Sequence, residues 1–250
     1  MGHILGWTAH FLNDMRAAVA LGHESIALAN RLCHPRAELI SRGMVAWVDG
    51  VVRGNHQLGV EQTEAALPLA AAVGAKRFEA QLRMGLAMLR WGQGDRAAAM
   101  TQAYVALEIC LHHGMGYVGP IVHGVIALVA GHRAERENAL AAGESALAQG
   151  VVSHNHLYFR ALAIDTCLDL GAWDAAVAHC AQLERYTAQE PLPWSDLVIA
   201  RGRALVQFGQ GERNTALLKR LTALRDEAAR VEFNLALPAL ERALVAAGCG

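Results

Sequence analysis

Histidine is the residue type in this chain with the clearest potential for metal chemistry. Twelve of the 250 residues are histidine. His112 and His113 lie in one predicted break between helices, and His154 and His156 lie in the next. Zinc takes three or four nitrogen or sulfur ligands, so the shared edge of these breaks is a weak candidate for a metal site. We favour solvated loop histidines, because adjacent histidines at a helix end point apart and no cysteine joins them. We therefore expect neither a metal nor a cofactor.

The acidic residues form no obvious pair for acid–base catalysis. Asp165 and Asp169 come nearest, because they lie four residues apart on one predicted helix face. Two carboxylates so placed can raise each other's pKa, but a polar helix face is the simpler interpretation. The sequence also contains no GxSxG nucleophile elbow and no GxxxxGK[ST] phosphate loop. We therefore expect a protein that is not an enzyme.

Helices must position these residues, and small residues recurring about every 40 residues indicate how the helices are arranged. Small residues let two helices approach closely, and a helical period of this length is typical of stacked helix pairs. The sequence therefore predicts an all-α fold, a right-handed α-solenoid of about six antiparallel helix pairs with a C-terminal capping helix. The recurring positions are Ala18, Gly59, Ala99, Ala139, Ala176 and Ala216.

The predicted array occupies the whole chain, residues 1–250, as one domain. Glycine, aspartate and asparagine at regular places predict the turns, since glycine ends helices and Asp or Asn caps the next one. The predicted units are 1–34, 35–75, 76–116, 117–155, 156–193 and 194–234, with a cap over 235–250.

Composition narrows the class of partner. The formal net charge is −1 and no run of basic residues occurs, which disfavours nucleic acid. The longest apolar window, residues 117–131, is too short for a membrane helix. The five cysteines are odd in number and have no CxxC spacing, as expected for reduced thiols. We therefore expect a cytoplasmic protein with no membrane or nucleic-acid partner.

The most informative predicted surface is the inner face of the leading helices. Methionine and aromatic side chains on a groove suit a helical peptide or a small apolar ligand. The alternative is that several of these side chains make ordinary core contacts between helices. Placing the repeats in register assigns ten residues to this face: Met44, Gln81, Met84, Met88, Trp91, Ile121, Tyr158, Asp165, Val198 and Arg201.

Single helix pairs are similar to the tetratricopeptide repeat. Gly171, Ala172 and Trp173, followed by Ala176 and Cys180, match the turn and second helix of that repeat. The unit here is longer than the roughly 34 residues typical of the family. The resemblance implies the architecture and says little about chemistry.

The second half also resembles the C-terminal tetratricopeptide-like region of bacterial class III adenylate/guanylate cyclase proteins. The motifs are EPLPWSD at 190–196, LGAWD at 170–174 and IARGRAL at 199–205, and the resemblance covers roughly residues 35–247. In that family a cyclase domain and an ATPase module precede the helices. Neither has room in this chain, so no catalytic residue is carried over. The resemblance implies a regulatory or interaction role near nucleotide signalling.

Three functions follow as hypotheses. The first is a non-catalytic scaffold whose concave face binds a protein or peptide segment, such as a cyclase or ATPase module. The second is a small-molecule sensor with the superhelix closed around its ligand. The third is a metal-dependent enzyme that uses the histidine edge.

Overall fold

The computed structural model describes residues 2–248, and within this range it contains helices and no strands, which confirms the all-α prediction. Short π-helical and 3₁₀ segments, η1 (Ala46–Val52) and η2 (Asn234–Ala236), interrupt the series. The α-helices are α1 (Gly2–Phe11), α2 (Met15–Arg31), α3 (Pro35–Val45), α4 (His56–Ala72), α5 (Lys76–Gly92), α6 (Arg96–His113), α7 (Gly119–Val129), α8 (Arg133–Leu147), α9 (His154–Leu170), α10 (Trp173–Thr187), α11 (Pro193–Gly209), α12 (Thr215–Arg230) and α13 (Leu237–Ala246).

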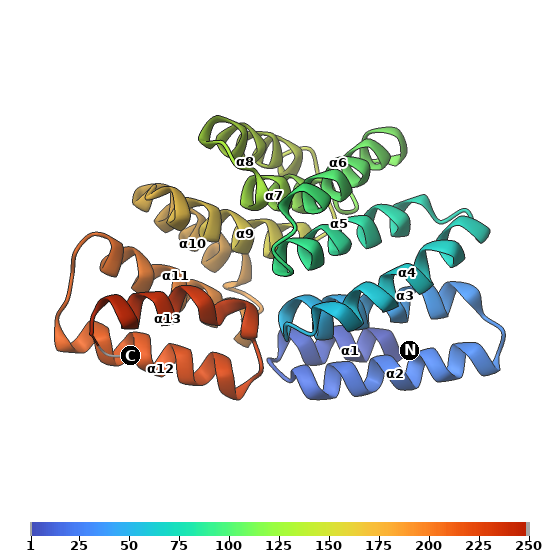
Figure 1. Ribbon diagram of the computed structural model, residues 1–250, viewed down its shortest axis with the longest axis horizontal. Helices are drawn as coiled ribbons and strands as arrows, with labels where there is room; N and C mark the ends of the chain where they lie inside the picture. The colour runs from blue at the N-terminus through green and yellow to red at the C-terminus, as the bar shows by residue number, and fades with distance from the viewer. Residues whose placement is uncertain (1, 249–250) are drawn as a thin grey trace.

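The helices form an inner and an outer layer. Each helix packs against the next one in the chain, and the odd-numbered helices from α1 to α13 also contact one another in sequence. Figure 1 shows the chain curving so that the N-terminal helices, in blue, and the C-terminal helices, in red, come side by side. Contacts between α1 and α11 and between η1 and η2 join these two ends.

Side-chain caps begin several outer helices where the sequence predicts turns. The carboxylates of Asp14 and Asp95 accept hydrogen bonds from backbone N–H groups in the first turns of α2 and α6, and the Asn214 amide oxygen does so in α12. Each cap satisfies one of the N–H groups that a helix start leaves unpaired. At the other end of a helix, Gly171 caps α9 in the left-handed conformation, with φ of 68°. Local chemistry therefore explains where these helices begin and end.

The small residues predicted between helices are buried in every unit except the last. Ala99 has no exposed surface and lies four residues after the cap Asp95, whereas Ala216 is exposed. The prediction for Ala216 is wrong because Asn214 caps α12 only two residues earlier, so the helix turns Leu217 inward instead. The buried members of the series are Ala18, Gly59, Ala99, Ala139 and Ala176.

The π-helical segment η1 is a feature that the repeat pattern does not predict. All seven of its residues are buried. Gly50 in this segment lies against Gly59 in α4, and a Cβ added to Gly50 would come within 2.6 Å of the Gly59 Cα. Real Cβ atoms do not approach backbone this closely, so the contact requires glycine. η1 thereby brings its backbone directly onto α4.

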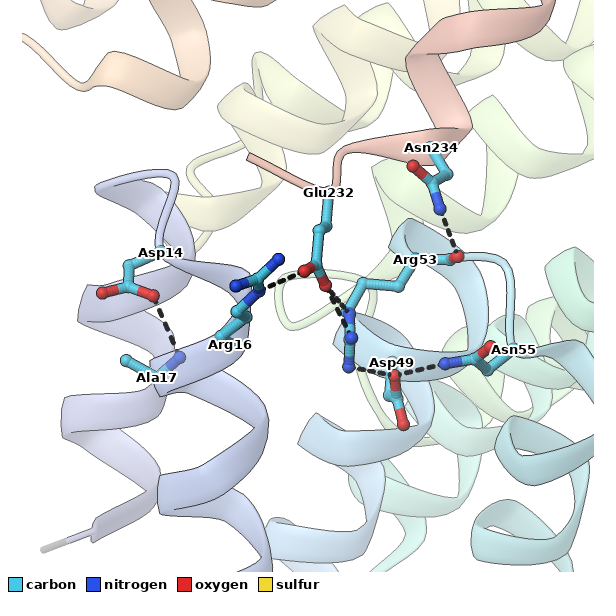
Figure 2. A network of polar contacts seen from close by, with 8 residues as sticks. All are labelled: Asp14, Arg16, Ala17, Asp49, Arg53, Asn55, Glu232 and Asn234. Atoms are coloured by element: carbon cyan, nitrogen blue, oxygen red, sulfur yellow. Dashed lines mark hydrogen bonds and ion pairs between the residues drawn. The ribbon is translucent and has the colours of Figure 1, made fainter. Parts of the chain in front are cut away.

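An ion-pair network joins the two ends of the chain. One Glu232 carboxylate oxygen pairs with Arg16 of α2, and the other lies 2.6 Å from the Arg53 guanidinium, next to η1. Asp49 holds the same guanidinium at 2.7 Å, and the Asn234 amide donates to the Arg53 carbonyl oxygen at 2.8 Å. We call Arg16, Arg53, Glu232 and Asn234 the closing contact (Figure 2).

Glu232 occupies an unusual backbone position for a charged residue. Its φ is 59°, in the left-handed region where the other helix ends of this chain mostly use glycine. A side chain in this region costs roughly 1 kcal/mol relative to the right-handed conformation. The carboxylate at this position makes contacts to both Arg16 and Arg53 that glycine could not make.

Across residues 2–248 no helix has both the length and the apolar character needed to cross a lipid bilayer.

Candidate functional site

The inner helices line a central cavity of about 620 Å³ that is partly open to solvent. This volume falls within the range of roughly 300–1,000 Å³ that is common for small-molecule pockets. Its wall comes from the segment around η1 and α4, from the middle of the chain and from the C-terminal segment, so the cavity depends on how the C-terminal segment meets η1. The lining includes Val51, His56 and Trp91 from the first half, Leu162 from α9, and Leu235 and Arg242 from the C-terminal segment.

A buried ion pair anchors one side of the central cavity. The Arg201 guanidinium lies 2.6 Å from the Asp165 carboxylate and also donates to the Ala236 carbonyl oxygen at 3.0 Å. Arg201 is almost fully buried, and Asp165 is half-buried. The pair neutralises a charge that would be costly to bury alone, and it ties α9 and α11 to η2. The polar side of the cavity is therefore held in a fixed position.

Asp165 and Asp169, the nearest candidates for a catalytic pair, each have a separate cation. Asp165 pairs with Arg201, and Asp169 lies 3.3 Å from Arg136. Both aspartates line the central cavity. Their carboxylates are therefore engaged in ion pairs rather than with each other.

Two further polar groups face the central cavity. Burial lowers the pKa of His56, so this imidazole is neutral at pH 7. Its ring lies against Gly92, where a Cβ would come within 2.4 Å of Nε2. Arg242 is exposed at the cavity edge and has no ion pair with any residue between 2 and 248. It is the cationic group available to a ligand there.

The residues predicted on the inner face divide among two cavities and the core. A second cavity of about 250 Å³, which we call the aromatic cavity, lies on the α1 side of the central one. The central cavity is lined by Met88, Trp91, Asp165 and Arg201. The aromatic cavity is lined by Gln81, Met84, Ile121 and Tyr158. Val198 lines a narrow space between the two cavities, and Met44 lies in the core.

Most of these residues are inaccessible from outside. Met44 has no exposed surface, because it packs against Gly6 and Gly22 of α1 and α2. Gln81, Trp91 and Asp165 are half-buried. The predicted inner face thus forms the walls of two partly open cavities, and most of its side chains are buried. The remaining members are all buried: Met84, Met88, Ile121, Tyr158, Val198 and Arg201.

The candidate metal-ligating histidines have separate partners. His154 Nε2 lies 2.7 Å from the Tyr117 carbonyl oxygen, and His156 stacks on Tyr186 with ring centroids 4.5 Å apart. His112 Nδ1 lies 2.8 Å from the Glu108 carbonyl oxygen, and His113 is exposed at the end of α6. Over the part of the chain that the structure describes, no three His, Cys, Asp or Glu side chains come together in a way that could hold a metal.

A cluster of aromatic side chains between α1, α9 and α11 escapes sequence reasoning. Tyr158 lies 5.2 Å from Trp47, 5.4 Å from Trp194 and 5.7 Å from Phe11, measured between ring centroids. The sequence does carry a partial signal, because Trp7, His10 and Phe11 have the spacing of one helix face. Nothing in the sequence indicates that this face meets Tyr158.

No protein-family model matches this chain, and no curated protein matches it. Its function must therefore be inferred from the cavities and the closing contact.

Proposed function

We propose that this chain is a non-catalytic binding module that encloses a small molecule in its central cavity. The module is a tetratricopeptide-like α-solenoid of about six helix pairs, and the contact between its ends closes it around the ligand. This is the sensor hypothesis of the three that the sequence leaves open.

One observation carries this proposal: the central cavity of about 620 Å³ has walls from the segment around η1 and from the C-terminal segment, which lie far apart in the sequence. A ligand there contacts the residues near η1 and the C-terminal segment together. Its binding therefore favours the closed arrangement, because a ligand stabilises the state that it binds better. The mostly apolar wall, with Arg242, His56 and the Asp165–Arg201 pair as polar anchors, fits a small molecule with a polar end.

A protein partner remains the second candidate, and one surface favours it. Ile4 and Leu5 of α1, Leu28 of α2 and Leu32, which follows α2, are about half exposed or more. Large apolar side chains gathered on a surface mark interaction sites in many proteins. The partner would bind the outside of the first helix pair rather than the inner face, where Met84 and Met88 are buried.

The signalling context depends on the resemblance alone. A link to nucleotide cyclase or ATPase proteins is consistent with a ligand-sensing module that reports to another domain or chain. We propose this regulatory role as the biological setting of the ligand site.

Native mass spectrometry of gently purified protein tests the ligand hypothesis. We expect one stoichiometric small-molecule mass on the wild type. Ala239→Trp places an indole in the central cavity, which Ala239 lines, and should remove that mass. Ala246→Trp is the matched control, because Ala246 is exposed on the same helix, α13. This control variant should retain the bound small-molecule mass.

Two results would contradict the proposal. The first is an equal bound mass on the Ala239→Trp variant and the wild type, which places the ligand elsewhere. The second is a co-purified protein in place of a small molecule, which supports the partner hypothesis instead.

A further inference from the structure

The aromatic cavity differs from the central cavity in its chemistry. Its volume is about 250 Å³, just below the range of drug-sized pockets. None of the side chains that line it carries a formal charge at neutral pH, since burial lowers the pKa of its one histidine, His154. Its walls include four aromatic rings besides that of Tyr117, namely Trp7, Phe11, Trp47 and Tyr158.

Tyr117 fixes the orientation of two polar side chains that line the aromatic cavity, Gln81 and His154. Its hydroxyl donates to the Gln81 amide oxygen at 2.8 Å, and its backbone carbonyl oxygen lies 2.7 Å from His154 Nε2. Burial raises the pKa of Tyr117 to about 12, so the hydroxyl keeps its proton. One residue therefore determines which atoms of Gln81 and His154 remain for a ligand.

Gln81 offers one donor group and His154 offers one acceptor, whereas the Trp47 indole nitrogen and the Tyr158 hydroxyl, on two other lining residues, are buried with almost no accessible surface. With its oxygen bound to Tyr117, Gln81 has its amide N–H groups free, and no residue from 2 to 248 accepts a hydrogen bond from them. The carbonyl next to His154 Nε2 requires the proton on that nitrogen, so Nδ1 carries a lone pair. Both residues are half-buried and line the cavity.

We propose that the aromatic cavity binds a neutral, flat molecule of one or two aromatic rings, which accepts a hydrogen bond from Gln81 and donates one to His154. The size of the cavity limits the number of rings, and the surrounding aromatic side chains favour stacked or edge-to-face contact with them. The aromatic rings can attract a quaternary ammonium group, but such a group accepts no hydrogen bond from Gln81 and the cavity wall offers no carboxylate to offset its desolvation. This site is independent of the ligand in the central cavity.

Fluorescence titration with 7-hydroxycoumarin at pH 7 tests this assignment. At this pH most of the probe is neutral, with a carbonyl acceptor and a hydroxyl donor on two fused rings. Coumarin lacks the hydroxyl, and naphthalene lacks both groups. We expect 7-hydroxycoumarin to bind about tenfold more tightly than coumarin, and coumarin more tightly than naphthalene, since one hydrogen bond in a buried site is worth roughly this factor.

Three substitutions separate the two hydrogen bonds. His154→Phe should abolish the preference for 7-hydroxycoumarin over coumarin and leave coumarin binding unchanged. Gln81→Met should weaken both coumarins about tenfold and spare naphthalene. Tyr117→Phe keeps the backbone carbonyl but frees the Gln81 amide, so it should weaken both coumarins without changing the preference between them. Near-ultraviolet circular dichroism confirms that each variant is folded.

Two controls locate the site. Gln57→Met replaces an exposed glutamine outside the cavity, and Ala239→Trp fills the central cavity; neither should change binding of 7-hydroxycoumarin. Equal affinity for naphthalene and 7-hydroxycoumarin would overturn the proposal. So would tighter binding of choline, an unchanged preference in His154→Phe, or loss of binding in Ala239→Trp, which would assign the probe to the central cavity.

Discussion

Where the outer helices meet their neighbours, the contact residues are alanine and glycine without exposed surface, such as Ala18, Ala99 and Ala176. Where the inner helices face one another, the contact residues are tryptophan, tyrosine, methionine and arginine, and they leave two cavities. Close packing of small residues leaves no room for adjustment, because protein interiors have the density of organic crystals. Large side chains from several helices fill space less completely. The helix contacts thus hold the fold, and the interior can hold a ligand.

The largest expected effect is at the helix contacts. Ala99→Arg forces a long charged side chain into a contact with no exposed surface, and it should destabilise the protein by about 4 kcal/mol or more, or prevent folding. Ala216→Arg is the matched control, because Ala216 is exposed at the corresponding repeat position, and its effect should stay within about 0.5 kcal/mol. Urea unfolding measures the free energy of unfolding of both variants. A similar loss of stability in the two variants would show that the contact at Ala99 is no more tightly packed than the exposed position at Ala216.

An intermediate effect is expected from pH in the interior. Burial lowers the pKa of His10 to about 3 from its ordinary 6.5. Between these values the unfolded chain binds a proton that the folded chain does not, so this residue's contribution to stability is present above pH 6.5 and is lost progressively as the pH falls towards 3. The loss amounts to about 2 kcal/mol between pH 6.5 and 5.

Replacing His10 isolates this contribution. Urea unfolding at pH 6.5 and at pH 5 should show a smaller drop in the free energy of unfolding for His10→Leu than for the wild type, by about 2 kcal/mol. Other buried histidines, such as His179 with its pKa lowered to about 4 by burial, contribute equally to both proteins and cancel. An identical drop would mean that His10 is protonated in the folded protein.

The smallest expected effect concerns the closing contact, which joins the two regions. The hydrogen bond from Arg16, together with the Arg53 guanidinium, lowers the pKa of the Glu232 carboxyl. Glu232→Gln keeps the shape and removes the charge, and it should cost about 0.5–1 kcal/mol. The stabilisation by the ionised Glu232 carboxylate is complete above the ordinary pKa of a glutamate, about 4.3. This stabilisation is lost as the pH falls below that value.

Hydrogen exchange detects this change where a global unfolding experiment would miss it. The amides of α2 and of η2 should exchange faster in Glu232→Gln, and more so at low salt, where the ion pairs are strongest. Glu241→Gln is the control, since Glu241 is exposed on α13 and makes no ion pair with a described residue. Unchanged exchange in Glu232→Gln would show that the ends meet without help from this charge.

Contacts between neighbours in the chain explain which parts of the fold can be predicted from the sequence. The caps at Asp14 and Asp95 and the left-handed Gly171 involve only neighbours in the chain, so the helices and their turns are predictable. The predicted small residue is buried where it lies four residues after the N-cap, as Ala99 does, or seven residues after it, as Ala139 does, because positions three apart share a helix face. The small-residue repeat fails at Ala216 because Asn214 shifts the start of α12 by two residues. One cap residue thus overrides a pattern spread over the whole chain.

The sequence by itself determined that the chain is helical, and most of the residues that it assigns to the inner face line one of the two cavities. Only the tertiary structure decided that those residues gather around two cavities, with Met44 in the core and Tyr158 among aromatic rings from α1 and α11. The physical reason is the sequence separation of the contacts. Arg16 and Glu232 lie 216 residues apart, and their meeting depends on the small angles between all the intervening helices, which no local pattern encodes.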